Sequence, residues 1–303
     1  MRPAWSVILL TTLIGAGQGL YLALFAAELA GLGGSTLFVP GAAVSLALLG
    51  AGLAASFFHL GRPERAWRSA AMWRTSWLSR EVIVLPAFMA AVAAWGAAHA
   101  LGKPTLALGI AGAALALALF VCTGMIYACL PFLQEWRTPL TIVNFTLLGG
   151  ASGLSAAAAL AAHLHAPLAR PYVIAALAVG AAAYLGRAAS LVRNARLRPK
   201  STLATAIGVK HPGIVQIAQG AMGGSFNTRE FFHGRPLEVV RAARWTLLAL
   251  VFPVPALLLL TAKLSAPLLG AAFLLQYAGL LAERWYFFAE AKHPQNLYYQ
   301  AIS

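Results

Sequence analysis

Eight long apolar runs dominate this sequence and decide what it can fold into. They lie at residues 5–30, 38–60, 81–101, 105–129, 138–163, 169–192, 243–263 and 266–290. Each is close to the length of about 20 residues that a helix needs to cross a bilayer. A bilayer admits only helices or closed barrels, and long Ala/Leu-rich runs without alternation favour helices. The sequence therefore predicts an all-α, polytopic membrane protein with eight transmembrane helices in a bundle.

Composition supports the same fold class. Of the 303 residues, 60% are hydrophobic and only 10% are charged, and the mean hydropathy is +0.76. Soluble domains carry about 25% charged residues. No polar stretch is large enough for an independent soluble domain, so we expect one integral membrane domain over residues 1–303. The first run is too long for a signal-peptide core and is expected to be retained as a helix.

Basic residues are distributed unevenly between the two ends of the predicted bundle. Eight crossings place both chain termini at one end. Of the 22 Lys and Arg residues, 17 fall in that end's loops and termini, and three fall at the other end. The positive-inside rule then predicts an N-in, C-in membrane protein, with the basic end in the cytoplasm. The net charge of +14 indicates orientation and docking of a negatively charged partner rather than nucleic acid, because the charges lie between apolar runs.

The longest connection, residues 193–242, is predicted to be a cytoplasmic partner-docking loop. Connections of this length are usually functional or disordered, and the aromatic content argues against disorder. A segment lying on lipid headgroups is the alternative, since it also favours aromatic residues and arginine. The candidate docking residues are Phe226, Asn227, Arg229, Phe231, Phe232 and His233.

A polar stretch, FFHLGRPERAWRSAAMWRTSWLSRE at residues 57–81, joins the second and third runs. His59 closes one predicted helix and Glu81 opens the next, and interaction with the helix dipoles would account for both. A membrane quinone gives a functional interpretation, because its head group needs hydrogen-bond donors and a proton route at the apolar–aqueous boundary. Arg65, Ser79 and the imidazole supply donors, and a His–Glu couple exchanges protons.

Polar residues within the apolar runs are also candidates, because they are costly in a membrane. Gln18, flanked by glycines in GAGQG, is expected either to make an interhelical hydrogen bond or to contact a ligand such as quinone. Glu28 is expected to be a solvated helix terminus. Adjacent Glu283 and Arg284 are expected to form a structural or interfacial pair.

Two other functional classes are weaker interpretations of the polar residues. A b-type haem requires two axial ligands, and His99 with His163 is the only plausible pair. A small-solute transporter would place more polar groups at the midplane and show a repeat, and neither is apparent. The two cysteines, Cys122 and Cys129, form no zinc or iron–sulfur motif, so no metal site is expected in this chain.

The motifs FFHLGRPERAW, SWLSRE and GAGQG together resemble the membrane-anchor (C) subunits of dimethyl-sulfoxide-reductase-type molybdoenzymes, and the likeness covers nearly the whole chain. It implies a subunit without haem or iron–sulfur cluster. Its implied partners are a four-cluster ferredoxin-like iron–sulfur subunit and a molybdopterin catalytic subunit. It also implies electron exchange with ubiquinone or menaquinone at a site that includes His59, Arg65 and Glu81.

The loop sequence HPGIVQIAQGAMGGSFNTREFFHG is similar to anchor subunits of cytoplasmic sulfite dehydrogenases. That branch implies sulfite oxidation with quinone as the electron acceptor, and catalytic partners on the cytoplasmic face. A quinol-oxidising anchor of a dimethyl-sulfoxide-type reductase is the alternative. The catalytic subunit sets the substrate, and the partner potentials set the direction of electron flow.

Overall fold

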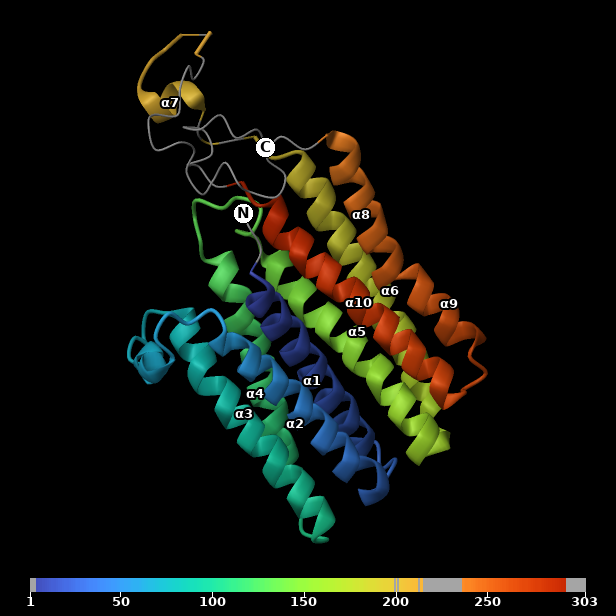
Figure 1. Ribbon diagram of the computed structural model, residues 1–303. Helices are drawn as coiled ribbons and strands as arrows, with labels where there is room; N and C mark the ends of the chain where they lie inside the picture. Colours follow the sequence, from blue (N-terminus) through green and yellow to red (C-terminus); the bar gives the residue numbers. More distant parts are fainter. Residues whose placement is uncertain (1–3, 199, 201, 212, 215–235, 293–303) are drawn as a thin grey trace.

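The computed structural model describes residues 4–198, 200, 202–211, 213–214 and 236–292. In this part of the chain the regular structure is helical without strands, and eight spans are long and apolar enough to cross a membrane. They pack into one elongated bundle, in which α1 begins and α10 ends at the same end (Figure 1). The predicted all-α polytopic fold is confirmed. Which end faces the cytoplasm stays a prediction.

The helices follow the apolar runs with small shifts at their ends. Their bounds are α1 Trp5–Leu29, α2 Ser35–Phe57, η1 Pro63–Ala70, α3 Trp77–Ala100, α4 Leu106–Ala128, α5 Pro139–Leu164, η2 Ala166–Leu168, α6 Ala169–Ala195, α7 Leu203–Ile207, α8 Leu237–Val251, α9 Pro253–Thr261 and α10 Ala266–Glu290. The seventh span consists of α8 and α9. It is interrupted at Phe252 and Pro253, because proline cannot donate the backbone hydrogen bond that would continue the helix.

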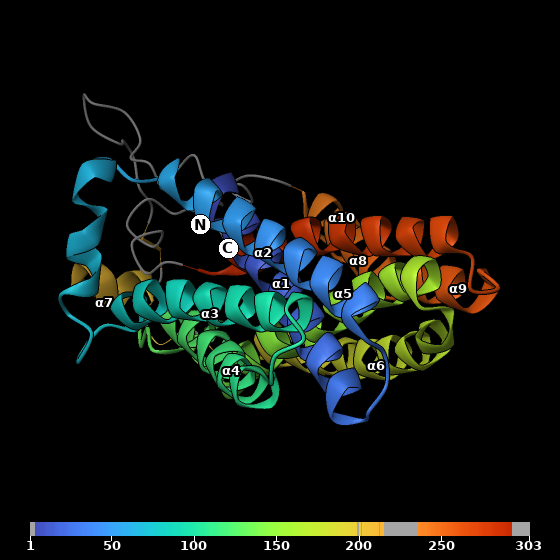
Figure 2. The same cartoon turned by 90° about the horizontal axis from the view of Figure 1, so that it is seen from below.

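Helices α1 and α5 form the centre of the bundle and pack against each other along their length. Helices α2 to α4 lie beside α1, and α6 with α8 to α10 lie beside α5 (Figures 1 and 2). This arrangement explains why α1 and α5 are the most buried spans. The bundle therefore has two groups of outer helices joined through one central pair.

Glycines allow the central pair to approach closely. A Cβ atom added at Gly153 of α5 would lie 2.1 Å from the backbone carbon of Gly19 in α1, and one at Gly19 would lie 2.2 Å from the carbonyl oxygen of Gly149. Gly15 also faces Gly149 at this crossing. Small residues let helix backbones meet in membranes, where van der Waals contact replaces the hydrophobic drive to associate.

Glu28 joins three helix ends at the opposite end of the bundle from the termini. Its carboxylate accepts hydrogen bonds from Trp95 Nε1 at 2.7 Å and from the hydroxyl of Thr105, and His99 Nε2 lies 3.3 Å away. The expectation of a solvated Glu28 is wrong, because the ends of α3 and α4 cover it. His99 is also packed against the rings of Phe38 and Trp95. It is thus engaged by neighbouring side chains, which disfavours its use as a haem ligand.

Candidate functional site

The connection between α2 and α3 presents the candidate histidine and arginine. His59 follows the last turn of α2, and Arg65 lies in η1, which packs against α3. Both side chains are exposed. Figure 1 shows this connection projecting sideways from the bundle, near the end where α1 begins. The two residues are therefore accessible from outside the bundle.

Ser79 and Glu81, in contrast, are buried. Helix α3 begins at Trp77, four residues before the predicted start, because Ser76 caps it by accepting from the backbone nitrogen of Ser79 at 3.3 Å. Glu81 consequently lies beyond the first turn, where the helix dipole has little effect. The dipole interpretation of this carboxyl is therefore disfavoured. Glu81 accepts a hydrogen bond from the hydroxyl of Thr123 in α4 and is only 5% exposed.

Gln18 of α1 contacts α4 farther from this end of the bundle than Glu81 does. Its Nε2 donates to the carbonyl oxygen of Ala116 at 2.8 Å. Ala116 and Thr123 are seven residues apart, so Gln18 meets α4 about 10 Å from the level of Glu81. This contact supports the interhelical hydrogen bond, and a quinone contact by Gln18 stays a prediction.

Arg80 braces the turn that leads into α3. Its guanidinium donates to the carbonyl oxygens of Trp73 at 2.9 Å and Arg74 at 2.8 Å, and it stacks over the Trp77 ring at 4.2 Å. These bonds fix the end of the connection that carries His59. The structure thus accounts for Arg80 without a substrate contact.

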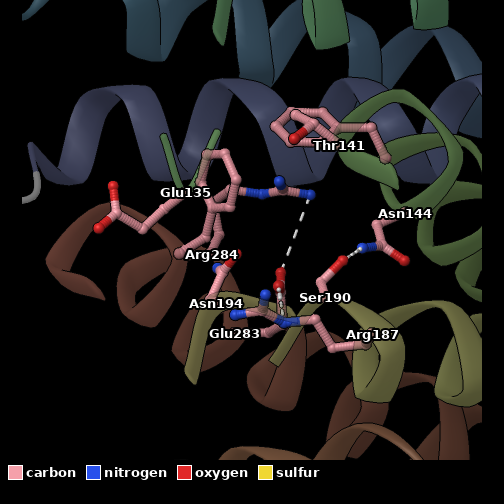
Figure 3. Close-up of a pocket in the computed structure, with 10 residues that line it drawn as sticks. Glu135, Thr141, Asn144, Arg187, Ser190, Asn194, Glu283 and Arg284 are labelled. Atoms are coloured by element: carbon pink, nitrogen blue, oxygen red, sulfur yellow. Dashed lines mark hydrogen bonds and ion pairs between the residues drawn. The ribbon is translucent and has the colours of Figure 1, made fainter. Parts of the chain in front are cut away.

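A buried charge cluster, composed of Arg187, Glu283, Arg284 and Glu290, lies between α6 and α10 near the end that carries the termini. Figure 3 shows the first three of these residues. Arg187 Nε is 2.9 Å from Glu283 Oε1, and its Nη2 is 3.6 Å from Glu290 Oε2. Arg284 Nη2 is 3.9 Å from Glu283 Oε2. The expected structural pair of Glu283 and Arg284 is present, but Arg187 is the closer partner of Glu283.

Sequence reasoning missed two of the four cluster residues, Arg187 and Glu290, and the polar pair beside the cluster. Asn144 of α5 donates to Ser190 of α6 at 2.7 Å, beside a cavity of about 10 Å³, which has room for about one water. The available signal was a polar or charged residue in each of three apolar runs at a similar distance from the same bundle end. The other cavity-lining residues outside the cluster are Glu135, Thr141, Phe145, Asn194 and Phe287.

The cluster predicts a strong stability effect. Arg187→Met leaves Glu290 without this cation and leaves Glu283 with only the more distant Arg284, which should cost about 3–5 kcal/mol of folding free energy. We expect a lower thermal aggregation midpoint for the detergent-purified chain. The double variant Arg187→Met/Glu290→Gln should recover part of the loss, because it removes the carboxylate that has lost its cation and keeps Glu283 beside Arg284. A single variant as stable as the wild type would show that these ion pairs do not hold the helices.

The candidate docking residues, from Phe226 to His233, lie outside the described residues, and so does much of the 193–242 connection. Its described portion includes the short helix α7. Within the described residues, no three His, Cys, Asp or Glu side chains gather as metal ligands would.

Comparison with known proteins identifies the class of this eight-span protein. A family model described as DMSO reductase anchor subunit (DmsC) matches residues 1–299. The chain belongs to this family, and the resemblance inferred from its motifs is confirmed. More particularly, the chain is 55% identical to the C subunit of the sulfite dehydrogenase of Allochromatium vinosum, over the whole of both proteins. The chain is therefore a multi-pass membrane subunit of an oxidoreductase complex, and its family implies catalytic and iron–sulfur partner subunits.

Proposed function

We propose that this chain is the quinone-reactive anchor of a sulfite:quinone oxidoreductase. The full-length similarity to the C subunit of a sulfite dehydrogenase supports the choice of sulfite. In the proposed complex, a molybdopterin subunit oxidises sulfite to sulfate with oxygen from water. A four-cluster iron–sulfur subunit transfers the released electron pair to this chain, where quinone takes it up with two protons and becomes quinol.

The observation that carries this proposal is the placement of Glu81. A buried carboxyl in an apolar span is costly and is a functional candidate by default. It is held by Thr123 on α4, and its helix α3 packs against η1, which presents Arg65. Ser79 and Glu81 thus lie in the first two turns of α3, and Arg65 lies on an element that contacts this helix.

Each of these residues has a proposed role. Arg65 and Ser79 hold the carbonyl oxygens of the quinone head group by donating hydrogen bonds. His59, which is exposed, and Glu81, which is buried, transfer protons between water and the head group. Gln18 is a proposed further contact, deeper in the bundle.

The proposed orientation puts this site and the docking loop on the cytoplasmic side. The bias of basic residues, 17 against three, supports this choice. The sequence from Phe226 to His233 would then bind the iron–sulfur subunit on the same side of the membrane. Electrons would need no path across the bilayer, because the last cluster and quinone would share one interface.

Co-purification tests the proposed partners. A tagged chain should be purified from its native membranes in mild detergent, followed by mass spectrometry and an optical spectrum. We expect a molybdopterin subunit, a ferredoxin-like subunit and no reduced b-haem band. A sulfoxide-reducing catalytic subunit would favour the quinol-oxidising alternative. A chain isolated alone, or with a b-haem spectrum, would contradict the anchor proposal.

A further inference from the structure

A second candidate binding site lies on the α5–α10 side of the bundle, away from the α2–α3 connection. It is a groove of about 430 Å³ between α6, the α8–α9 junction and α10. Ligand sites for small molecules have volumes of about 300–1,000 Å³ and are lined mainly by apolar side chains with a few polar groups. This groove has the size and the lining expected of such a site.

The break between α8 and α9 contributes one wall of the groove. Pro253 begins α9 directly after Phe252, whose φ of −116° and ψ of −74° depart from regular helix values, and both residues line the groove. The opposite wall is α6, where Gly180 leaves open space that an added Cβ atom would not fill. These residues belong to the middle parts of their membrane spans, so the groove lies in the hydrocarbon region.

One polar side chain interrupts the apolar lining. Gln276 of α10 is 5% exposed, and its buried Oε1 has no hydrogen-bond partner among the described residues. An unsatisfied buried acceptor costs about 1–3 kcal/mol, and lipid hydrocarbon offers no donor to satisfy it. The amide therefore favours a ligand that carries a hydrogen-bond donor into the hydrocarbon region.

Two aromatic residues that line the groove favour a ligand with a planar ring. Tyr184 and Phe252 pack edge to face, with ring centroids 5.2 Å apart, and both line the groove. Aromatic side chains pack favourably against a planar ring, in stacked or edge-to-face geometry. A phospholipid acyl chain has neither a ring nor a polar group at this depth. A quinol has both, together with an isoprenoid tail that suits an apolar groove.

We propose that this groove is a second binding site, specific for an isoprenoid quinol or quinone. The Gln276 Oε1 accepts from a quinol hydroxyl, and its amide nitrogen can donate to a quinone carbonyl, so one side chain recognises both redox states. Tyr184 and Phe252 contact the ring, and the apolar walls formed by α6 and α9 hold the tail. This inference extends the proposed function but uses none of the residues of the α2–α3 site.

Photolabelling of the purified complex tests the second site. A photoreactive azidoquinone should label peptides of α6 or of the α8–α9 junction, and excess unlabelled quinone should compete. Gln276→Met keeps the side-chain length and removes the amide, and we expect about tenfold weaker labelling there. Gly180→Leu fills the open space and should block labelling through shape alone. Substitution of His59 should leave this labelling intact, which separates the two sites.

Different results would overturn the second site and the proposed function. Labelling that Gln276→Met leaves unchanged, or a groove that retains only phospholipid in mass spectra of the intact complex, would overturn the second site. That result would not affect quinone reduction at the α2–α3 site. If the complex reduces no quinone at all but the groove is labelled and Gln276→Met weakens the labelling, the proposed function fails and the groove remains a quinone-binding site.

Discussion

Gly153→Ala is expected to destabilise the bundle by about 3 kcal/mol or more, although alanine is the better helix former. The added Cβ would lie 2.1 Å from both the carbonyl carbon of Gly19 and the backbone nitrogen of Leu20. Backbone atoms cannot rotate away as a flexible side chain can, so α1 and α5 must separate. The measurement is the yield of monodisperse chain in size-exclusion chromatography, together with its thermal aggregation midpoint.

Gly150 supplies a matched control in the same helix. A Cβ at this position would lie 3.6 Å from Val179 Cγ1, which is ordinary van der Waals contact. Gly150→Ala should therefore be neutral, or stabilise the helix by up to about 1 kcal/mol through its propensity. If Gly153→Ala and Gly150→Ala behaved alike, the close crossing of α1 and α5 would be contradicted.

His59→Ala should abolish quinone-coupled turnover and leave the complex assembled. Loss of a general acid–base group typically reduces the rate by about 100-fold or more. His59 is exposed at the end of α2, so its removal should create no cavity and cost little stability. Electron transfer from the catalytic partner to a soluble dye should stay unchanged, because that transfer does not require the quinone site. The measurement is the ratio of quinone reduction to dye reduction in the purified complex.

His163→Ala is the matched control for this substitution. His163 is exposed near the end of α5, in the last turn of the helix, at the opposite end of the bundle from the α2–α3 connection. We expect wild-type quinone reduction from this variant. Equal losses from both substitutions would contradict a site specific to His59. A loss confined to His163→Ala would revive the haem interpretation that pairs it with His99.

Hydropathy was sufficient to predict the bundle but not its internal contacts. All eight spans follow from the length of the apolar runs, since a bilayer leaves little choice of structure. Helix α3 begins four residues before the predicted start, because Ser76 caps it and the helix extends through the charged residues Arg80 and Glu81. The prediction for Glu28 was wrong because a position close to the end of a helix suggested contact with water. In the structure, Trp95 and Thr105 donate hydrogen bonds to Glu28 from other helices.

The candidate site was only partly predictable. The motif located His59, Arg65, Ser79 and Glu81, but it could not indicate that the first two are exposed and the last two buried. Partners distant in sequence are set by packing rather than by local pattern. Thr123 therefore entered only with the structure, as did the pairing of Arg187 with Glu283.

Sulfite-dependent quinone reduction by the purified complex, with and without this chain, tests whether the chain is the quinone-reactive subunit. A water-soluble quinone analogue should be reduced by the complete complex. The catalytic and iron–sulfur subunits without the anchor should reduce a soluble dye but not the quinone. We therefore expect quinone reduction, but not dye reduction, to depend on the anchor. Equal quinone reduction by the partners alone, or dye reduction only by the complete complex, would contradict it.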